Sequence, residues 1–317
     1  MAEAKNWYEV KQNNRIGYAL MLFVLRCFPV MIMRLLAFPI GFFYWIFSKR
    51  VRRVSRAYFS RLSEFSHTKK HFSTLKHIIS FALNLVEDTQ AWAKKLSFKN
   101  VKWQDDDVAD LVRNIDEGKG TVIVISHLGN AQMLKALASA GESGTQRKMS
   151  ITTISDAHIS AGFNALLMHI NSDSAFHIIS SDDIGMETIF TLQERLEHGE
   201  VVVIAGDRVS AHTKRNVAIE FLGQRAELPY GVFLLLSLLN VPTYFVNGLR
   251  EKDFSLKSNY NMYVKKNTVS FDCSRKEREE RIIESANSYI KNLEALCQLY
   301  PYQWYNFFDF WQAQPVL

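Results

Sequence analysis

Apolar and polar positions divide the chain into two parts of different character. After about residue 100, short apolar runs alternate with segments whose apolar residues recur every three or four positions. The runs predict buried strands, and the recurring positions predict amphipathic helices. We expect strands at 121–126, 150–155, 176–180, 201–205, 217–222, 243–249 and 260–264. We expect helices at 131–140, 157–170, 186–198, 230–239 and 275–299. This alternation predicts an α/β fold with a mostly parallel central sheet flanked by helices.

The first 100 residues predict a helical region of another kind. Residues 16–47 are strongly apolar, but they are interrupted by Arg26, Pro29, Arg34 and Pro39. Neither half therefore reaches the roughly 20 apolar residues of a simple spanning helix. A basic segment, 49–61, follows with six positive charges and no acidic residue before Glu64, and residues 71–95 show helical periodicity.

An apolar, aromatic-rich segment followed by a basic one is typical of a chain that lies in the interface of a bilayer. Its arginines would then contact anionic headgroups. Two buried helices packed on the main domain, with a solvated basic face, would give the same pattern, and both interpretations stay open. We expect residues 1–100 to form a helical membrane-associated region and residues 101–317 to form the α/β domain.

Composition narrows the class of protein. The 317 residues are 48% hydrophobic and 22% charged, which is typical of a folded chain. The net charge of +6 is compatible with an anionic membrane or a nucleic acid. The basic segment matches no nucleic-acid-binding motif, so we expect no nucleic-acid partner. Cys27, Cys273 and Cys297 are spaced for neither a zinc site nor a disulfide framework, which favours reduced thiols and a cytoplasmic location. We expect no metal site and no cofactor.

Two constellations at predicted strand ends could carry chemistry. His127 follows the strand at 121–126 and precedes a turn at Gly129, where side chains project toward a ligand. Five positions later stands Gln132, where a carboxylate would be the stronger partner for a histidine base. Asp207 and Arg208 follow the strand at 201–205, and a parallel sheet would bring them to the same edge as His127. Arg208 could bind a phosphate or carboxylate through two hydrogen bonds.

Three other segments have structural explanations of equal or greater weight. Residues 221–231, which include Arg225, predict a turn into an apolar helix whose start could receive an anionic group. The aromatic cluster at 301–308 is more typical of a core than of a ligand site. The acidic run 105–107 predicts a solvated helix start. The chain contains no Gly-x-Ser-x-Gly nucleophile motif, no Gly-Lys-Ser/Thr phosphate loop and no Gly-x-Gly-x-x-Gly motif.

Taken in order, four motifs resemble the bacterial lipid A late acyltransferase family, within the glycerolipid acyltransferase superfamily. They are Ser126-His-Leu-Gly-Asn130, Gly199 to Arg208, Phe221-Leu-Gly223 through Pro229-x-Gly231, and Pro301-Tyr-Gln-Trp304. The apolar and basic N-terminal region also looks like the membrane-facing segment of that family. The resemblance covers most of the chain, and its specificity comes from the order of the motifs rather than from any single one.

The resemblance implies transfer of a fatty acyl chain from a thioester of acyl carrier protein, or of CoA, to a hydroxyl of a lipid or glycolipid. The reaction would take place on the cytoplasmic face of the bacterial inner membrane, with no metal and no covalent acyl-enzyme. The family motif is His-x4-Asp/Glu, so His127 corresponds to its general base and Gln132 to its acid. The candidate catalytic residues are His127, Gln132 and Asp207. The candidate substrate-binding residues are Ser126, Asn130, Arg208 and Arg225.

The departure at Gln132 leaves three interpretations open. Another acid, such as Asp207, serves His127 in an active enzyme; or the chain is an inactive relative that binds lipid or a partner without turnover; or a glutamate has been replaced deliberately. A soluble acyl-CoA-dependent transferase with no membrane contact is a further alternative.

Overall fold

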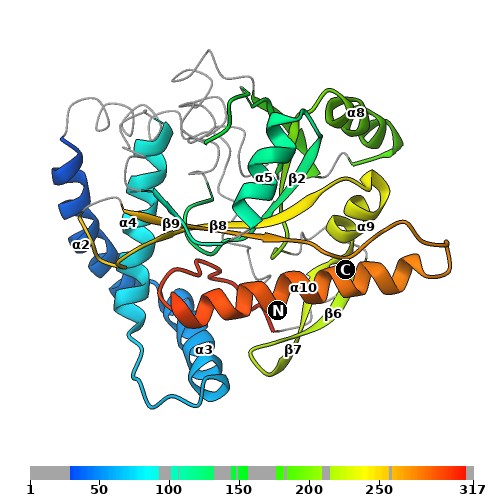
Figure 1. Ribbon diagram of the computed structural model, residues 1–317. Coiled ribbons are helices and arrows are strands. Elements are labelled where there is room, and N and C mark those ends of the chain that lie inside the picture. The colour runs from blue at the N-terminus through cyan, green and yellow to red at the C-terminus, as the bar shows by residue number, and fades with distance from the viewer. Residues whose placement is uncertain are drawn as a thin grey trace.

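The computed structural model describes residues 29–92, 101–105, 107–131, 144–147, 149–155, 176–181, 184–208, 215–256 and 259–311. The predicted helices at 131–140 and 157–170 lie almost entirely outside these ranges. Within them the chain has an α/β fold, with a seven-stranded sheet flanked by helices (Figure 1). The strand order is β1-β9-β8-β2-β5-β3-β4.

The central sheet is mostly parallel, as the alternation of apolar runs predicts. Its strands are β1 (Val101–Trp103), β2 (Thr121–Ile125), β3 (Ile151–Ser155), β4 (Phe176–Ser180), β5 (Val201–Ala205), β8 (Thr243–Arg250) and β9 (Tyr260–Lys266). Only the β8–β9 pair is antiparallel. Strands buried on both faces read as continuous apolar runs, which is why most of them could be located in the sequence.

Alternate residues of the central strands pack against helices on opposite faces. Val122, Val124 and Val202 contact the layer formed by α8 (Met186–Glu197), α9 (Tyr230–Leu239) and α10 (Arg278–Leu299). Ile123 and Val203 face α5 (Asp107–Asp116). The period of two along a strand therefore builds two hydrophobic cores, one on each side of the sheet.

Residues 216–229 differ from the prediction. The expected strand at 217–222 is β6 (Asn216–Phe221), but it lies outside the central sheet and pairs antiparallel with β7 (Gln224–Pro229). The segment of β7 had been expected to be a turn leading into a helix. Its charged residues alternate with buried ones, and a hairpin with one exposed face permits that pattern.

The acidic run also has a further role that the sequence did not reveal. Helix α5 begins at Asp107, as expected, but Asp105 and Asp107 accept hydrogen bonds from the backbone N–H groups of Val264 and Lys266, at 2.8 and 2.9 Å. These carboxylates therefore fix the end of β9 and are not merely solvated.

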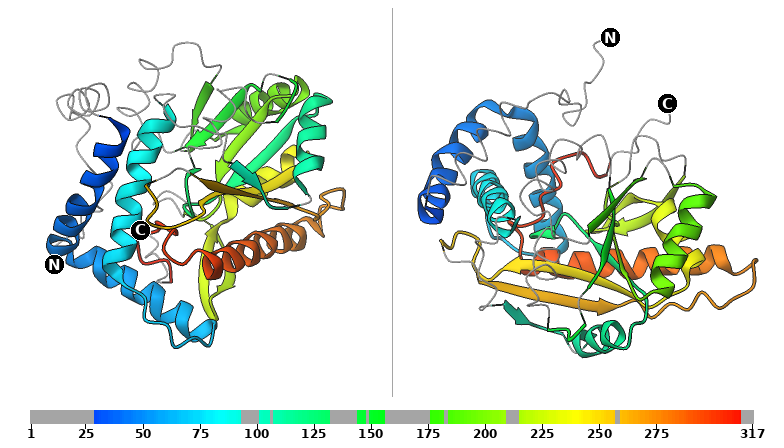
Figure 2. Two further views of the ribbon diagram at one scale, coloured as in Figure 1. Left: turned by 60° about the vertical axis from the view of Figure 1, so that its left-hand side comes forward. Right: turned by 90° about the horizontal axis from the view of Figure 1, so that it is seen from above.

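Three N-terminal helices gather at one side of the molecule: α2 (Val30–Phe47), α3 (Lys49–Phe65) and α4 (Thr74–Trp92) (Figures 1 and 2). Helix α2 continues through Pro39, so the predicted division of the apolar segment at that residue was wrong. The uninterrupted helix is long and apolar enough to cross a membrane. It packs along α4 closely enough that a Cβ on Gly41 would lie 3.1 Å from the Cα of Ile79.

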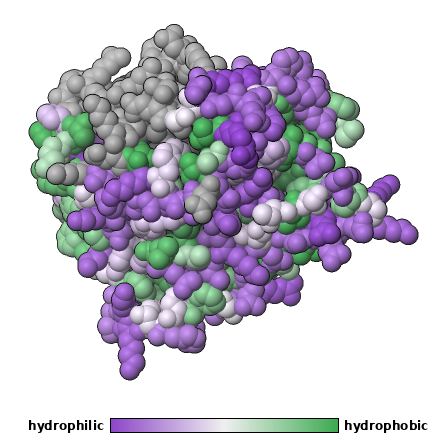
Figure 3. All heavy atoms as spheres, viewed as in Figure 1, coloured by the Kyte–Doolittle hydropathy of each residue, from purple (hydrophilic) through white to green (hydrophobic). Residues whose placement is uncertain are grey.

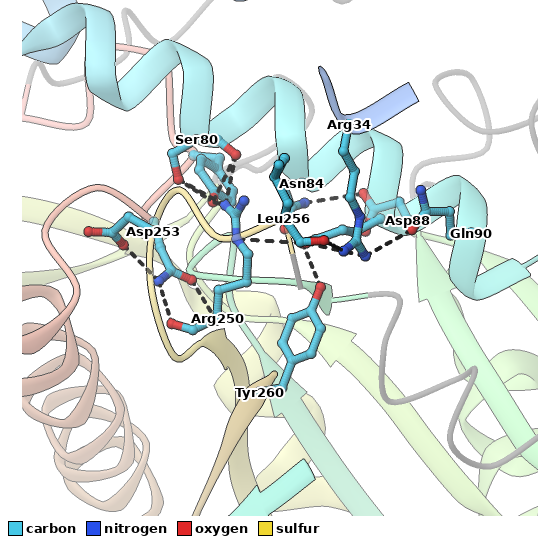
Figure 4. A network of polar contacts seen from close by, with 12 residues as sticks. Arg34, Ser80, Asn84, Asp88, Gln90, Arg250, Asp253, Leu256 and Tyr260 are labelled. Atoms are coloured by element: carbon cyan, nitrogen blue, oxygen red, sulfur yellow. Dashed lines mark hydrogen bonds and ion pairs between the residues drawn. The ribbon is translucent and has the colours of Figure 1, made fainter. Parts of the chain in front are cut away.

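A buried network of charged and polar groups joins α2, α4 and the sheet (Figure 4). The carboxylate of Glu87 on α4 lies 3.8 Å from Arg34 of α2 and 3.5 Å from Arg250 of β8. Tyr260 of β9 donates a hydrogen bond to the same carboxylate at 2.5 Å. All three charged side chains are almost completely buried, at most 4% exposed. The opposite charges therefore offset one another's cost of burial.

We predict that Glu87→Gln lowers the free energy of unfolding by about 3–5 kcal/mol, because the buried Arg34 and Arg250 would lose the carboxylate that lies between them. Urea unfolding of the purified protein in detergent measures the loss. Glu251→Gln is the control, because Glu251 pairs with Lys102 at the surface and its loss should leave the midpoint nearly unchanged. Equal midpoints for the two variants would contradict the stabilising role of the network.

Candidate functional site

The candidate site lies at the carboxyl ends of β2 and β5. These strands run parallel in register, with Ile125 opposite Ala205, so the residues two positions further along each chain are neighbours. His127 Nδ1 and Asp207 Oδ1 are 2.8 Å apart. The structure thus brings together two residues that are 80 positions apart in the sequence, at the edge where the strand pattern had placed them.

The Asp207 carboxylate is fully buried and surrounded by donors. Its Oδ2 accepts the backbone N–H of His127 at 2.8 Å and the indole N–H of Trp304 at 3.3 Å. Burial alone would raise the pKa of Asp207, but His127 and the charge of Arg208 outweigh it and hold the pKa below its usual value. Asp207 is therefore an anion near neutral pH.

An ionised carboxylate can only accept hydrogen bonds, so His127 must donate from Nδ1. In the neutral ring, Nε2 then carries no proton and can act as a base. The His127 side chain is 30% exposed, whereas Asp207 is enclosed, so solvent and ligands reach the histidine and not the carboxylate. This arrangement suits proton abstraction from a substrate group, with Asp207 stabilising the imidazolium that forms.

The loop that carries His127 is fixed by its own backbone. Gly129 adopts φ +78°, and its N–H donates to the carbonyl of Gln303 at 2.8 Å. A Cβ at this position would lie 2.2 Å from the carbonyl oxygen of Gly248, so glycine is required here. The next residue, Asn130, donates its N–H to that same carbonyl oxygen at 2.8 Å.

Two predicted substrate-binding residues lie beneath the surface. Ser126 and Asn130 are both 2% exposed. The Ser126 hydroxyl accepts hydrogen bonds from the N–H of Leu128 at 3.1 Å and from Asn247 at 2.5 Å. Burial is at odds with direct substrate contact, and the structure instead gives Ser126 a role in holding the loop.

The two candidate arginines are placed differently. Arg208 directly follows Asp207 and its charge lowers the pKa of that carboxyl, while its guanidinium lies 5.7 Å from the ring centroid of Phe308. Arg225 is exposed on β7, opposite Glu220 near the turn of the hairpin. Among the described contacts, none joins Arg225 to His127 or Asp207, so its role in substrate binding stays a prediction.

Gln132 lies outside the residues that the structure describes. The acidic partner that a histidine base requires is nevertheless present, because Asp207 occupies the Nδ1 side of the ring. No group of three or more histidine, cysteine, aspartate or glutamate side chains suited to a metal ion occurs among the described residues.

Sequence reasoning missed the C-terminal contribution to the site. The cluster at 301–308 was expected to be core, and Trp304 is indeed buried, but its indole N–H contacts Asp207. The available signal was chemical, since a buried tryptophan requires an acceptor for its N–H. Nothing in the sequence indicated which acceptor that would be.

Comparison with known proteins adds no relative: no protein-family model matches the chain, and a search of curated proteins finds no match. The geometry alone therefore defines the class of site. It is a partly exposed histidine held by a buried carboxylate at the carboxyl edge of a mostly parallel sheet.

We predict that the Asp207–His127 pair contributes stability that depends on pH. Because the pKa of Asp207 is lower in the folded chain, this contribution is complete above the ordinary value of 3.8 and is lost as pH falls through the lower folded value. The difference in unfolding free energy between wild type and Asp207→Asn should therefore shrink below pH 3.8. Chemical denaturation across pH measures it, with exposed Asp272→Asn as the control. A difference that stays constant down to about pH 3 would contradict the ionised pair.

Proposed function

We propose that this chain is a membrane-associated O-acyltransferase, which moves a fatty acyl chain from a thioester to a hydroxyl of a lipid or glycolipid. The observation that carries the proposal is His127 held by the buried Asp207 carboxylate at a strand end. The four ordered motifs, which resemble the lipid A late acyltransferases, supply the reaction class, with acyl carrier protein or CoA as the donor's carrier.

Acyl transfer requires one group that first accepts a proton and then donates it. Nε2 of His127 takes the proton of the acceptor hydroxyl while its oxygen attacks the thioester carbonyl. Asp207 stabilises the imidazolium through Nδ1. The carbon–sulfur bond then breaks, the thiolate takes the proton from His127, and an ester remains. Arg208 stands beside the pair, where it can bind an anionic group of the acceptor or donor.

The geometry favours an active enzyme over an inactive relative. A glutamine at position 132 brings no charge to the histidine, but Asp207 does so from the neighbouring strand. The acidic function that the motif assigns to Gln132 is therefore supplied by another residue. We propose that Gln132 has another role or none in proton transfer.

The exposed face of α2 supports membrane contact. Met33, Arg34, Ala37 and Gly41 are buried against the domain. The opposite face exposes large apolar side chains, namely Met31, Ile32, Leu35, Leu36, Ile40, Phe42, Phe43, Tyr44, Ile46 and Phe47. Apolar surface extends along the side of the molecule where α2 lies (Figure 3). A continuous apolar face of this kind is typical of a surface that meets lipid.

Helix α2 is fastened to the domain along its length. Arg34 approaches Glu87 near one end, Gly41 packs on Ile79, and Trp45 donates a hydrogen bond to Thr74 at 3.0 Å near the other end. We propose that α2 lies against the bilayer with the domain behind it and does not cross the membrane as an isolated helix.

Helix α3 adds charge next to this apolar face. Arg52 and Arg61 contact protein groups, Arg52 bonding the carbonyl of Trp45 and Arg61 the side chain of Gln224. The other basic residues, Lys49, Arg50, Arg53 and Arg56, are exposed. Exposed arginines beside aromatic side chains suit the anionic headgroups of an inner membrane's cytoplasmic face.

We predict that the purified protein transfers acyl chains from acyl carrier protein thioesters to a membrane lipid extract. His127→Ala should lower the rate by at least about 10³-fold, because it removes the group that accepts the hydroxyl proton. His198→Ala is the control, because His198 follows the end of α8 and its ring bonds the carbonyl of Glu194 in that helix. Mass spectrometry of the lipid products measures the transfer.

Three results would count against this function or its setting. Absence of transfer both by this chain and after Gln132→Glu would contradict it. Lipid bound stoichiometrically without turnover would favour a lipid-binding protein. Transfer from acyl-CoA to a soluble acceptor, without vesicle binding, would favour a soluble transferase.

We predict that replacing Lys49, Arg50, Arg53 and Arg56 together by glutamine weakens binding to phosphatidylglycerol vesicles. Each basic residue near the surface contributes about 1 kcal/mol. Binding of the wild type should fall with added salt, and that dependence should flatten in the variant. Co-sedimentation measures both effects. The control variant removes the same number of exposed charges elsewhere, at Arg275, Lys276, Arg281 and Lys291, and it should bind like the wild type. An equal loss of binding in both variants would contradict a specific role for α3.

A further inference from the structure

The C-terminal segment runs beside the loop that carries His127. Gly129 donates its N–H to the carbonyl of Gln303, and Tyr305 donates its N–H to the carbonyl of His127, both at 2.8 Å. Leu128 and Trp304 pair between these two bonds as an antiparallel bridge. The segment therefore acts as an added strand that fixes the backbone on both sides of the catalytic loop.

The indole of Trp304 is held rigidly with its N–H toward Asp207. The side chain is 1% exposed, and its ring lies 5.0 Å from Tyr58, 5.1 Å from Phe221 and 5.2 Å from Phe310, measured between centroids. Rings at these distances fill the space around the indole. The N–H cannot turn away from the carboxylate unless this cluster opens.

The backbone of Trp304 is held from the side of α3 and α4 as well. Nε2 of His77 donates to the carbonyl of Trp304 at 2.9 Å, and Nδ1 of His77 accepts from the hydroxyl of Ser55 at 2.9 Å. Burial lowers the pKa of His77 to about 4, so the ring is neutral near pH 7 and offers one donor and one acceptor. The helix that carries the exposed basic residues is thus linked by hydrogen bonds to the residue that contacts Asp207.

We propose that Trp304 is a positioning residue, whose indole N–H holds Oδ2 of Asp207 so that Oδ1 stays on Nδ1 of His127. Two donors on one carboxylate oxygen, this N–H and the backbone N–H of His127, prevent the carboxylate from rotating. They also stabilise its charged form. Trp304 does not touch the substrate. The inference rests on the proposed function only in that His127 is taken as the base.

The groups that face Asp207 make this role measurable. They are His127 and Arg208 from the strand ends, with Tyr289 and Cys297 from α10. Burial raises the pKa of Tyr289 and of Cys297, so both stay uncharged near neutral pH. A change in the acid limb of the pH–rate profile therefore reports the Asp207–His127 pair.

The test compares Trp304→Phe with Trp311→Phe. Trp311 belongs to the same aromatic cluster, 5.9 Å from Trp304, but its indole N–H donates to the carbonyl of Phe221. Each variant removes one indole N–H and a similar volume, from a buried side chain at Trp304 and from a half-buried one at Trp311. We expect Trp304→Phe to lower kcat by about 10- to 100-fold, as for loss of one hydrogen bond to a charged group, with KM little changed. The acid limb of the pH–rate profile should move to higher pH, because the Asp207 carboxylate loses a hydrogen-bond donor that stabilises its charged form. Trp311→Phe should leave kcat within about 2-fold and the acid limb in place.

A second measurement needs no change at Trp304. In protein labelled with ¹⁵N-tryptophan, the indole N–H signal of Trp304 should shift with pH as the pair titrates, and that of Trp311, assigned through Trp311→Phe, should not. Three results would overturn the inference. They are an unchanged kcat and acid limb in Trp304→Phe, equal effects in both variants, and an indole signal of Trp304 that does not change with pH. If the wild type transfers no acyl chain, the proposed function fails while the indole signal still tests the contact.

Discussion

A buried carboxylate is tolerated only where donors surround it, and the site is organised by that constraint. Asp207 has no exposed surface, and its donors come from the loop after β2 and from the C-terminal segment. These groups lie 80 and 97 positions away along the chain. They meet only when the sheet has formed and the C-terminal segment has closed over it. The compensated carboxylate and the His127–Asp207 pair therefore form together, since both need the same assembled structure.

A second set of buried charges connects the sheet that carries the site to helix α2. Glu87 joins Arg34 of α2 to Arg250 of β8, so the helix with the apolar exposed face is attached to the sheet that carries His127. Near the other end of α2, Trp45 and Thr74 hold the same helix against α4. Under the proposed function, this attachment would keep the histidine at a fixed depth relative to the lipid in which the acceptor hydroxyl lies.

The sequence revealed the parts of the fold that local pattern controls. Apolar runs located the strands of the central sheet, apart from the short β1. The signal is clearest for β2 and β5, which are buried on both faces. In-register parallel strands then placed Asp207 beside His127. The sequence pattern gave wrong predictions where tertiary contacts determine the secondary structure. Helix α2 continues through Pro39, packed along α4, and β7 is a strand that pairs with β6. The indole of Trp304 and the burial of Ser126 depend on distant segments, which no local signal reports.

Under the proposed function, Asp207 rather than residue 132 supplies the negative charge to His127. The most direct measurement is kcat for acyl transfer by Asp207→Asn and Gln132→Glu, compared with wild type in one assay. We expect a loss of up to about 10⁴-fold for Asp207→Asn, comparable to the same acid-to-amide change in a serine-protease triad. For Gln132→Glu we expect a change of less than about 10-fold. Near-wild-type turnover by Asp207→Asn, or activity that appears only in Gln132→Glu, would contradict it.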